Sequence, residues 1–318
     1  MALNLEKTVV CAGGANMDIQ GFSNAPINMR DSNPGVIRLC PGGVGRNIAE
    51  NLARLGARVC MVSAVGSDYF GEMILKSCSD AGIDISEIEK IPDTRSSSYL
   101  VLTDKDGDML AAISDMHIIK GLGADFIRRH AAAFDRADAI VLDPNLSPDA
   151  LEALTSGWAG KPLFADPIST TYARTLKQFL PRLKMLKCNR QEAEIFAEMQ
   201  IESDADMEKA AERILEQGTE CVVITSGEKG VFYQARDGAP IRKRHAPLQP
   251  VSATGAGDSF TAAMVYGWLA GLSAEDSLEL AMRAAEVTLM DPLTVSPAIG
   301  SIVDDRIVKN PEGTGDNR

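Results

Sequence analysis

Short apolar segments alternate with longer amphipathic segments along most of the chain. The apolar segments have the length of buried strands and fall at residues 8–13, 58–65, 139–142, 162–165, 185–187 and 220–225. Segments with a helical spacing of apolar residues lie at 44–55, 70–81, 256–270 and 274–290. This alternation predicts an α/β fold, in which a doubly wound, mostly parallel sheet is flanked by helices on both faces.

Two stretches interrupt the alternation. Residues 17–39 hold strand-like pieces at 18–22 and 36–39 around a polar loop, and residues 96–113 have the pattern of a β-hairpin. Neither stretch is expected to lead into a crossover helix. We therefore predict a small β-sheet lid, formed by about 17–40 and 96–114, that projects from the main body and can cover a site.

Length, composition and charge limit the possible functions. The chain has 318 residues and a hydrophobic content of 45%, which is enough for a large core. We expect a single domain over residues 1–305 and a frayed polar tail at 306–318. The net charge of −12 argues against nucleic acid or an anionic membrane as a partner, although local N–H groups can still bind a small anion.

Cysteine and histidine usage predicts neither a disulfide framework nor a structural metal site. The six cysteines include no CxxC pair and mostly have apolar neighbours, and the three histidines lack metal-ligand spacing. The first residues lack the apolar stretch of a signal peptide, and no run approaches the roughly 18 apolar residues of a membrane span. We therefore expect a cytoplasmic protein.

The turn at residues 252–260, Ser-Ala-Thr-Gly-Ala-Gly-Asp-Ser-Phe, opens an apolar helix. Gly255 and Gly257 permit a tight turn, so that backbone N–H groups, including those of Ala256 and Asp258, can bind an anion at the helix N-terminus. A carboxylate beside a bound anion is unfavourable unless it meets a hydroxyl nucleophile, so we predict that Asp258 aligns such a hydroxyl. The structural alternative is a loop in which Asp258 only caps the helix.

Polar residues near the first strand and the helix at 44–55 are suited to a hydroxylated ligand. Asn16 and Asp18 follow the first strand, at the edge where parallel sheets bind ligands, and a carboxylate there can accept two hydrogen bonds from a diol. Gly42 and Gly43 permit close backbone approach, and Asn47 offers a donor and an acceptor. The alternatives are a solvated turn aspartate and a structural glycine-rich helix start. The G-x-G-x-x-G spacing of a dinucleotide site is absent here.

Two further motifs follow later strands. Asn189 and Glu192 lie one helical turn apart, and Glu192 can hold Mg²⁺ through water; the alternative is an N-capped surface helix. The turn after the strand at 220–225 is suited to nucleotide contact through Thr225, Ser226, Gly227 and Gly230.

Together and in this order, the five motifs resemble those of the ribokinase-like (PfkB) carbohydrate kinase family over about residues 8–300. The segment 42–47 is similar to the family's first signature and the segment 254–258 to its second. Asn189 and Glu192 are similar to its N-x-x-E motif. The resemblance implies a ribokinase-like sheet with a small lid, and an ATP-dependent phosphotransferase that acts on an alcohol group.

The resemblance also implies a role for each motif. Asp258 is the catalytic base, acting late in the reaction, and the N–H groups of Gly255, Ala256, Gly257 and Asp258 form an anion hole for the γ-phosphoryl group. We expect the helix N-terminus to lower the pKa of Asp258. The residues implied to hold the sugar are Asn16, Asp18, Gly42, Gly43 and Asn47. Those implied to contact ATP are Asn189, Thr225, Ser226, Gly227 and Gly230, with Glu192 organising Mg²⁺.

Segments around the lid imply the acceptor. Residues 31–35, 41–49, 63–68, 97–100 and 113–116 are most similar to family members that act on pseudouridine, which implies formation of pseudouridine 5′-phosphate and ADP. The uracil ring presents donors and acceptors that polar side chains can satisfy; the candidates are Ser32, Asn33, Ser98, Asp115 and Asn145. The alternatives are a PfkB-type kinase of ribose, fructose, adenosine or uridine, and a non-catalytic sugar-binding regulator.

Two expectations concern ions and assembly. Many relatives begin the second signature with an aspartate that is associated with a K⁺ site, but Ser252 stands there in this chain, which weakens such a site. The unpaired strand edges of a lid can be covered by a second copy, so a homodimer through the lid is a further expectation.

Overall fold

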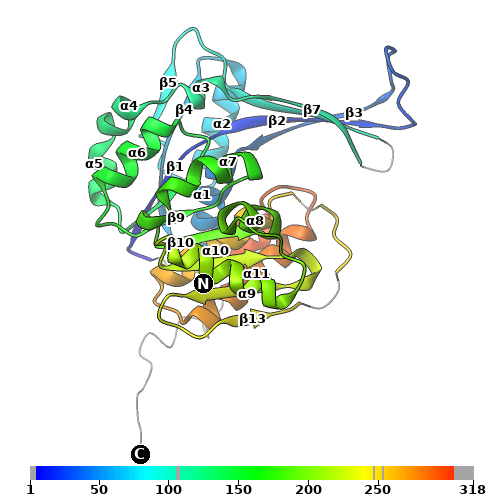
Figure 1. The fold of residues 1–318 in the computed structure, drawn as a ribbon. Coiled ribbons are helices and arrows are strands. Elements are labelled where there is room, and N and C mark those ends of the chain that lie inside the picture. Colours follow the sequence, from blue (N-terminus) through cyan, green and yellow to red (C-terminus); the bar gives the residue numbers. More distant parts are fainter. Residues whose placement is uncertain (1–4, 105–107, 246–247, 253, 304–318) are drawn as a thin grey trace, which may run out of the picture.

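The computed structural model describes residues 5–104, 108–245, 248–252 and 254–303. The predicted tail at 306–318 and the tip of the predicted hairpin at 105–107 lie outside the described residues. The described chain forms a large α/β body from which a small sheet projects (Figure 1).

The body is built on one large sheet. Its strands are β1 (Thr8–Ala12), β4 (Arg58–Gly66), β5 (Ile88–Ile91), β8 (Ala139–Leu142), β9 (Leu163–Ala165), β10 (Met185–Asn189), β11 (Cys221–Thr225), β12 (Val231–Ala235) and β13 (Ile241–Lys243). Their order is β13-β12-β11-β10-β9-β8-β1-β4-β5. All neighbours from β11 to β5 are parallel, and β12 and β13 add an antiparallel edge.

Two apolar layers cover the sheet, because alternate residues of the central strands point to opposite faces. In β1, Val10 and Ala12 join one core, and Val9 and Cys11 join the other. The first core is covered by α3 (His117–Lys120), α4 (Ala124–Arg129), α5 (Ala131–Arg136), α6 (Pro148–Gly157), α7 (Thr170–Leu176), the 3₁₀ helix η1 (Lys177–Arg182), α8 (Arg190–Ala197) and α9 (Asp204–Glu216). The second is covered by α1 (Val44–Leu55), α2 (Tyr69–Asp80), α10 (Ala256–Leu269), α11 (Ala274–Leu289) and the 3₁₀ helix η3 (Pro297–Ile302). The predicted doubly wound, mostly parallel α/β fold is confirmed.

The strand order places a topological switch point between β1 and β8, where a ligand crevice is expected. The chain adds β4 and β5 on one side of β1, and β8 to β13 on the other. At such a switch point the loops after the two strands part, which favours ligand binding there. Gly13 and Asp143 directly follow β1 and β8. None of the helices that the structure describes is long and apolar enough to cross a membrane.

The predicted small sheet is confirmed, and its role as a lid stays a prediction. It consists of β3 (Gly35–Gly42), β2 (Asn16–Ser23), β6 (Ser97–Thr103) and β7 (Met109–Asp115), in this order. β2 and β6 are parallel, and the outer pairs are antiparallel. One detail of the prediction is wrong: β3 runs directly into α1, with Gly43 as the only residue between them. The left-handed φ of Gly43, 99°, turns the chain from strand to helix within one residue.

Candidate active site

The glycine-rich turn leads into α10 at the edge of the crevice. Gly255 has a left-handed φ of 87°, and a Cβ atom there would lie 1.9 Å from the carbonyl oxygen of Thr294. Only glycine therefore fits at this position. The first N–H groups of α10 have no intrahelical acceptor, and they follow directly from this turn. Asp258 lies in the first turn of α10 and is only 9% exposed.

Asp258 faces the N-terminal part of α1. Its Oδ2 accepts a hydrogen bond of 2.8 Å from Nδ2 of Asn47. The pKa of Asp258 is raised to about 7 by burial and by the charge of Asp166, although Asn47 and Lys187 act in the opposite direction. The expectation that the helix N-terminus lowers this pKa is wrong, because desolvation and a nearby like charge outweigh the helix dipole.

Arg46 orients the amide of Asn47. The Arg46 guanidinium is buried and donates hydrogen bonds to Asn47 Oδ1 at 2.8 Å and to Glu50 Oε2 at 2.5 Å. Since Arg46 occupies the oxygen end of this amide, the NH₂ end is turned toward Asp258. Glu50 also pairs with Arg54, at 2.7 Å. A continuous chain of contacts therefore runs from Glu50 through Arg46 and Asn47 to Asp258.

Asn16 and Asp18 lie together on the inner face of the lid. Asn16 Nδ2 donates to Asp18 Oδ1 at 2.6 Å. Burial raises the pKa of Asp18, while Asn16 and the positive charge of Arg46 lower it. A Cβ on Gly42 would lie 2.3 Å from Asp18 Oδ2, and one on Gly43 would lie 3.0 Å from Asn16 Oδ1. The structure thus brings these four predicted sugar-site residues together.

Asn145 lies at the crevice beside Asp143. The Asp143 carboxylate accepts hydrogen bonds from the backbone N–H groups of Gly14 at 2.8 Å, Gly45 at 3.1 Å and Asn145 at 2.8 Å. It therefore ties the loop after β1 to the start of α1. A Cβ on Gly14 would lie 3.5 Å from Asn145 Nδ2, so this amide borders the same loop. Burial raises the pKa of Asp143 to about 6.

Ser98 and Asp115 face away from Asp18. Residues in register on neighbouring strands share a face, and successive residues of a strand alternate between faces. Asp18 is in register with Tyr99, whereas Ser98 is in register with Asp115. The predicted grouping of Ser98 and Asp115 with the sugar site is therefore contradicted by the strand register.

Ser32 and Asn33 belong to the loop between β2 and β3, at the far end of the lid (Figure 1). The Asn33 amide holds this loop together: Nδ2 donates to the carbonyl oxygens of Asn28 and Asp31, both at 3.0 Å, and Oδ1 accepts from the N–H of Asn28 at 2.7 Å. Ser32 is exposed. The side chain of Asn33 therefore shapes the loop, and its N–H groups are not available to a base.

An apolar cavity of about 340 Å³ adjoins the N-terminus of α10. Its apolar wall is formed by Val231, Leu248, Pro250, Phe260, Met282, Ala285 and Leu289. The predicted residues among its lining are Thr225, Gly227, Gly230, Ala256 and Gly257. The volume lies within the roughly 300–1,000 Å³ of small-molecule sites. Apolar walls that end at the N–H groups of a helix suit an aromatic base that carries phosphates.

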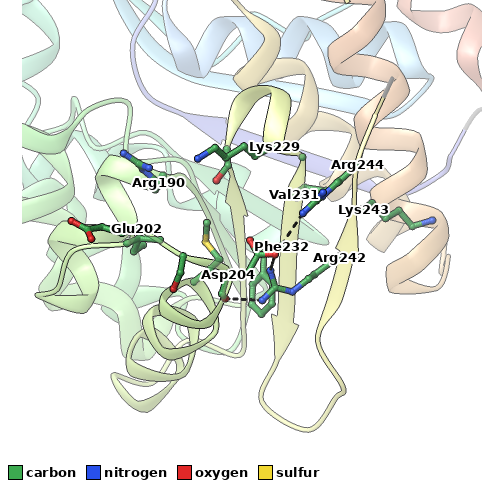
Figure 2. A pocket seen from close by; sticks show the side chains of 14 residues that line it. Arg190, Glu202, Asp204, Lys229, Val231, Phe232, Arg242, Lys243 and Arg244 are labelled. Carbon is green, nitrogen blue, oxygen red and sulfur yellow. Dashed lines mark hydrogen bonds and ion pairs between the residues drawn. The ribbon is translucent and has the colours of Figure 1, made fainter. Parts of the chain in front are cut away.

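Ser226 lines a different cavity, of about 70 Å³. Figure 2 shows basic side chains around it, among them Arg190 and Arg242. Arg242 is paired with Asp204 at 3.2 Å and with Glu208 at 2.9 Å. This cavity is too small for a nucleotide. Ser226 does not line the apolar cavity, but its N–H donates a hydrogen bond of 2.9 Å to the carbonyl oxygen of Gly230, which lines both cavities.

Asn189 and Glu192 form a capping box at the start of α8. Asn189 Oδ1 accepts from the N–H of Glu192 at 2.9 Å, and Glu192 Oε2 accepts from the N–H of Asn189 at 2.8 Å. The capping alternative therefore holds. Asn189 is exposed, as expected at a surface, but Glu192 is only 2% exposed. Burial, together with the charge of Asp166, raises the pKa of Glu192.

Within the described ranges, no group of three or more His, Cys, Asp or Glu side chains could hold a metal ion. Mg²⁺ often binds through one or two carboxylates together with phosphates and water. Glu192 fits such a site through its second carboxylate oxygen, because the capping box uses only Oε2.

Parts of the strand register, the turns and the buried charges were not predicted from the sequence. Arg46, Asp143, Asp166 and Lys187 were not singled out from the sequence, although a charged residue inside an apolar strand, such as Lys187 in Met185–Asn189, is itself a signal. Such a residue is rarely buried without a partner or a function.

Comparison with known proteins identifies the family of this chain. The pfkB family carbohydrate kinases match residues 6–299. Pseudouridine kinase of Escherichia coli (strain K12) is 34% identical over 304 residues, which cover 96% of this chain and 97% of that protein. Guanosine-inosine kinase of Exiguobacterium acetylicum is 32% identical over 285 residues, 88% and 93% of the two chains. A carbohydrate kinase from Agrobacterium tumefaciens has a similar structure, with a TM-score of 0.79, 26% identity and 95% of both chains covered. The chain therefore belongs to the pfkB family of carbohydrate kinases.

Proposed function

We propose that this protein transfers the γ-phosphoryl group of ATP to the 5′-hydroxyl of pseudouridine. Family membership makes it an ATP-dependent phosphotransferase with a hydroxyl acceptor. The observation that carries the proposed chemistry is a buried carboxylate, Asp258, held by Asn47 at the first turn of α10. The choice of pseudouridine is supported by the 34% identity to a pseudouridine kinase over nearly the whole chain. Residues 1–305 are proposed to act as one kinase domain.

Asp258 aligns the acceptor hydroxyl and receives its proton as the new bond forms. A carboxyl group with a pKa of about 7 is a better proton acceptor near neutral pH than an ordinary aspartate. The N–H groups of residues 255–258 stabilise the transferring phosphoryl group. Mg²⁺, when bound, neutralises charge on the phosphates, and Glu192 is the proposed protein carboxylate beside it.

The ribose is proposed to lie between the inner face of the lid and α1, where Asn16, Asp18 and Asn47 donate and accept hydrogen bonds. Gly42 and Gly43 let the sugar approach the backbone. The base is proposed to contact the inner face near Tyr99, which is in register with Asp18, and Asn145 at the crevice. ATP is proposed to occupy the apolar cavity beside α10 with Thr225, Gly227 and Gly230 at its edge, and Asn189 is proposed to reach its phosphates.

Phosphorylation of a panel of acceptors tests this proposal. Pseudouridine is expected to have the highest kcat/KM among pseudouridine, uridine, adenosine, inosine, guanosine, ribose and fructose, with Asp258→Asn as the inactive control. A purine nucleoside is the second candidate, because guanosine-inosine kinase is 32% identical to this chain. Preference for inosine or guanosine would replace pseudouridine in the proposal, and ATP turnover with none of these acceptors would refute it.

We further propose a homodimer through the outer face of the lid. Ile37, Leu39, Leu102 and Ile113 share the face opposite Asp18 and are 75%, 45%, 41% and 66% exposed. A contiguous apolar face of this kind is typical of a protein–protein interface. Light scattering is expected to show a dimer for the native chain and a monomer for Ile113→Asp, whereas a monomeric native chain would refute the dimer.

The proposed compartment is the cytoplasm. All six cysteines are free thiols in the structure. Burial raises the pKa of the thiols of Cys11, Cys60, Cys78 and Cys188, which keeps them protonated and unreactive. Such free thiols are typical of proteins that work in a reducing compartment.

A further inference from the structure

Lys187 is a buried cation in the central strand β10. Its side chain is 6% exposed, and Nζ lies 2.8 Å from Oδ2 of Asp166. A Cβ atom built on Gly257 would lie 2.9 Å from the same Nζ. The ammonium group therefore lies beside the Cα atom of Gly257, and it occupies the space that a side chain at position 257 would need.

The hydrogen bonds of Lys187 are incomplete. An ammonium group has three N–H donors, and Asp166 is the one hydrogen-bond acceptor that the described residues provide for it. Asp166 Oδ2 also accepts from Thr261 Oγ1 at 2.9 Å, so the pair is anchored to α10 one turn after Asp258. Donors of Lys187 thus remain for a ligand at the turn. Asp166 holds the Lys187 side chain in place, but its negative charge repels an anionic ligand. The positive charge of Lys187 is needed to offset this repulsion.

We propose that Lys187 binds the γ-phosphoryl group and stabilises it during transfer. This inference rests on the proposed phosphotransfer at Asp258. In that step the acceptor oxygen forms a bond to the γ-phosphorus while the bond to the bridging oxygen breaks. The electron pair leaves with ADP, and the hydroxyl proton passes to Asp258. Lys187 gives up no proton; it donates hydrogen bonds to phosphoryl oxygens, and Gly257 keeps the path between them free of a side chain.

Nucleotide binding by Lys187→Met tests the contact without any acceptor. Calorimetry should show at least a tenfold loss of affinity for the ATP analogue AMP-PCP, while the affinity for ADP stays within about threefold, because only AMP-PCP carries a γ-phosphonate. With acceptor present, kcat should fall by about 10²–10³-fold, as for loss of one oxyanion donor. Lys184→Met, directly before β10 and paired with Glu220, is the matched control and should change neither affinity. Equal losses for both nucleotides would show a structural role and overturn the proposal.

A second variant separates binding from folding. Lys187→Met leaves Asp166 as a buried charge without its partner, which can destabilise the fold. The double variant Asp166→Asn/Lys187→Met removes both charges, and its melting temperature should recover while its AMP-PCP affinity and kcat remain low. Recovery of kcat in the double variant would refute a phosphoryl contact. Failure of the native chain to phosphorylate any acceptor would refute the proposed function instead, since the nucleotide comparison does not depend on the acceptor.

Discussion

Nδ2 of Asn47 donates a hydrogen bond of 2.8 Å to Oδ2 of Asp258, and this contact joins α1 to α10 across 211 positions of sequence. One residue comes from the segment that continues the lid, and the other from the turn that is proposed to hold the phosphoryl group. The contact places an amide donor on the proposed base. It therefore affects both the pKa of Asp258 and the orientation of its carboxylate.

The activity of the free enzyme should depend on the ionisation of Asp258. Only the carboxylate form can accept the hydroxyl proton, and its pKa is about 7. A plot of kcat/KM against pH should therefore rise by about tenfold per pH unit below pH 7 and level off above it. A profile that is flat from pH 5.5 to 8.5 would show that Asp258 is not the titrating base.

Asp258→Asn should abolish turnover and stabilise the fold above neutral pH. The folded pKa lies above the usual value of 3.8, so folding favours the protonated form. The stability that this provides is complete below pH 4 and is lost as the pH rises through 7. The variant should gain about 2–4 kcal/mol in unfolding free energy at pH 8 relative to the native chain. It should gain little at pH 4. Denaturant titrations at the two pH values measure this, and an equal difference at both would contradict the assignment.

Arg46→Gln should weaken catalysis through Asn47. Without the guanidinium, the oxygen end of the Asn47 amide loses its donor, and the NH₂ end is no longer directed at Asp258. We expect kcat to fall more than 10-fold, and the unfolding free energy to fall by about 3 kcal/mol because Glu50 loses a buried partner. Arg54→Gln is the control. It also pairs with Glu50, but its side chain is 31% exposed, and a change within about 1 kcal/mol is expected. Similar effects of the two variants on kcat would contradict the role of Arg46.

The inner face of the lid should contribute to the choice of acceptor. Tyr99→Ala removes an aromatic ring from the face that carries Asp18. We expect the ratio of kcat/KM for pseudouridine to that for ribose to fall by about 3–10-fold, as for the loss of one aromatic contact. Ser98→Ala, on the opposite face of the same strand, should leave this ratio unchanged. The reverse outcome would restore the original assignment of Ser98 to the base site.

Turnover should not require K⁺. Ser252 stands where many relatives have an aspartate, and its Oγ accepts a hydrogen bond from the N–H of Thr254 at 3.3 Å. A hydroxyl carries no charge to attract the ion. Turnover rates in KCl and in tetramethylammonium chloride at equal ionic strength should agree within about twofold. A large loss of turnover without K⁺ would show a K⁺ site that does not depend on a carboxylate at position 252.

The fold was predictable where local chemistry marks both ends of an element. The helix predicted at 44–55 matches Val44–Leu55, because Gly43 and Gly56 flank it with φ values of 99° and 102°. Strand β5, Ile88–Ile91, was missed because its sequence, Ile-Glu-Lys-Ile, is short and half polar. The antiparallel edge formed by β12 and β13 was also missed, because its pairing is set by contacts with β11.

The candidate site was predictable in its motifs but not in its geometry. Asp18 stood out because it follows the first predicted strand, and Asn47 because it lies one turn into a helix that begins at a glycine-rich segment. The exclusion of Ser98 depends on the register of β2 with β6, which no local pattern determines. The pKa of Asp258 depends on Asp166, which lies 92 positions earlier in the chain and was not part of any motif.

The single residue between β3 and α1 connects the lid directly to the start of α1. Gly43 is the joint, and the N–H of Asn47 is bonded to the carbonyl oxygen of Gly43 at 2.7 Å. A swing of the lid about this joint acts within one helical turn of the amide that touches Asp258. We therefore expect closure of the lid over an acceptor to be coupled to the alignment of Asp258, so that ATP is spared from attack by water while no acceptor is present.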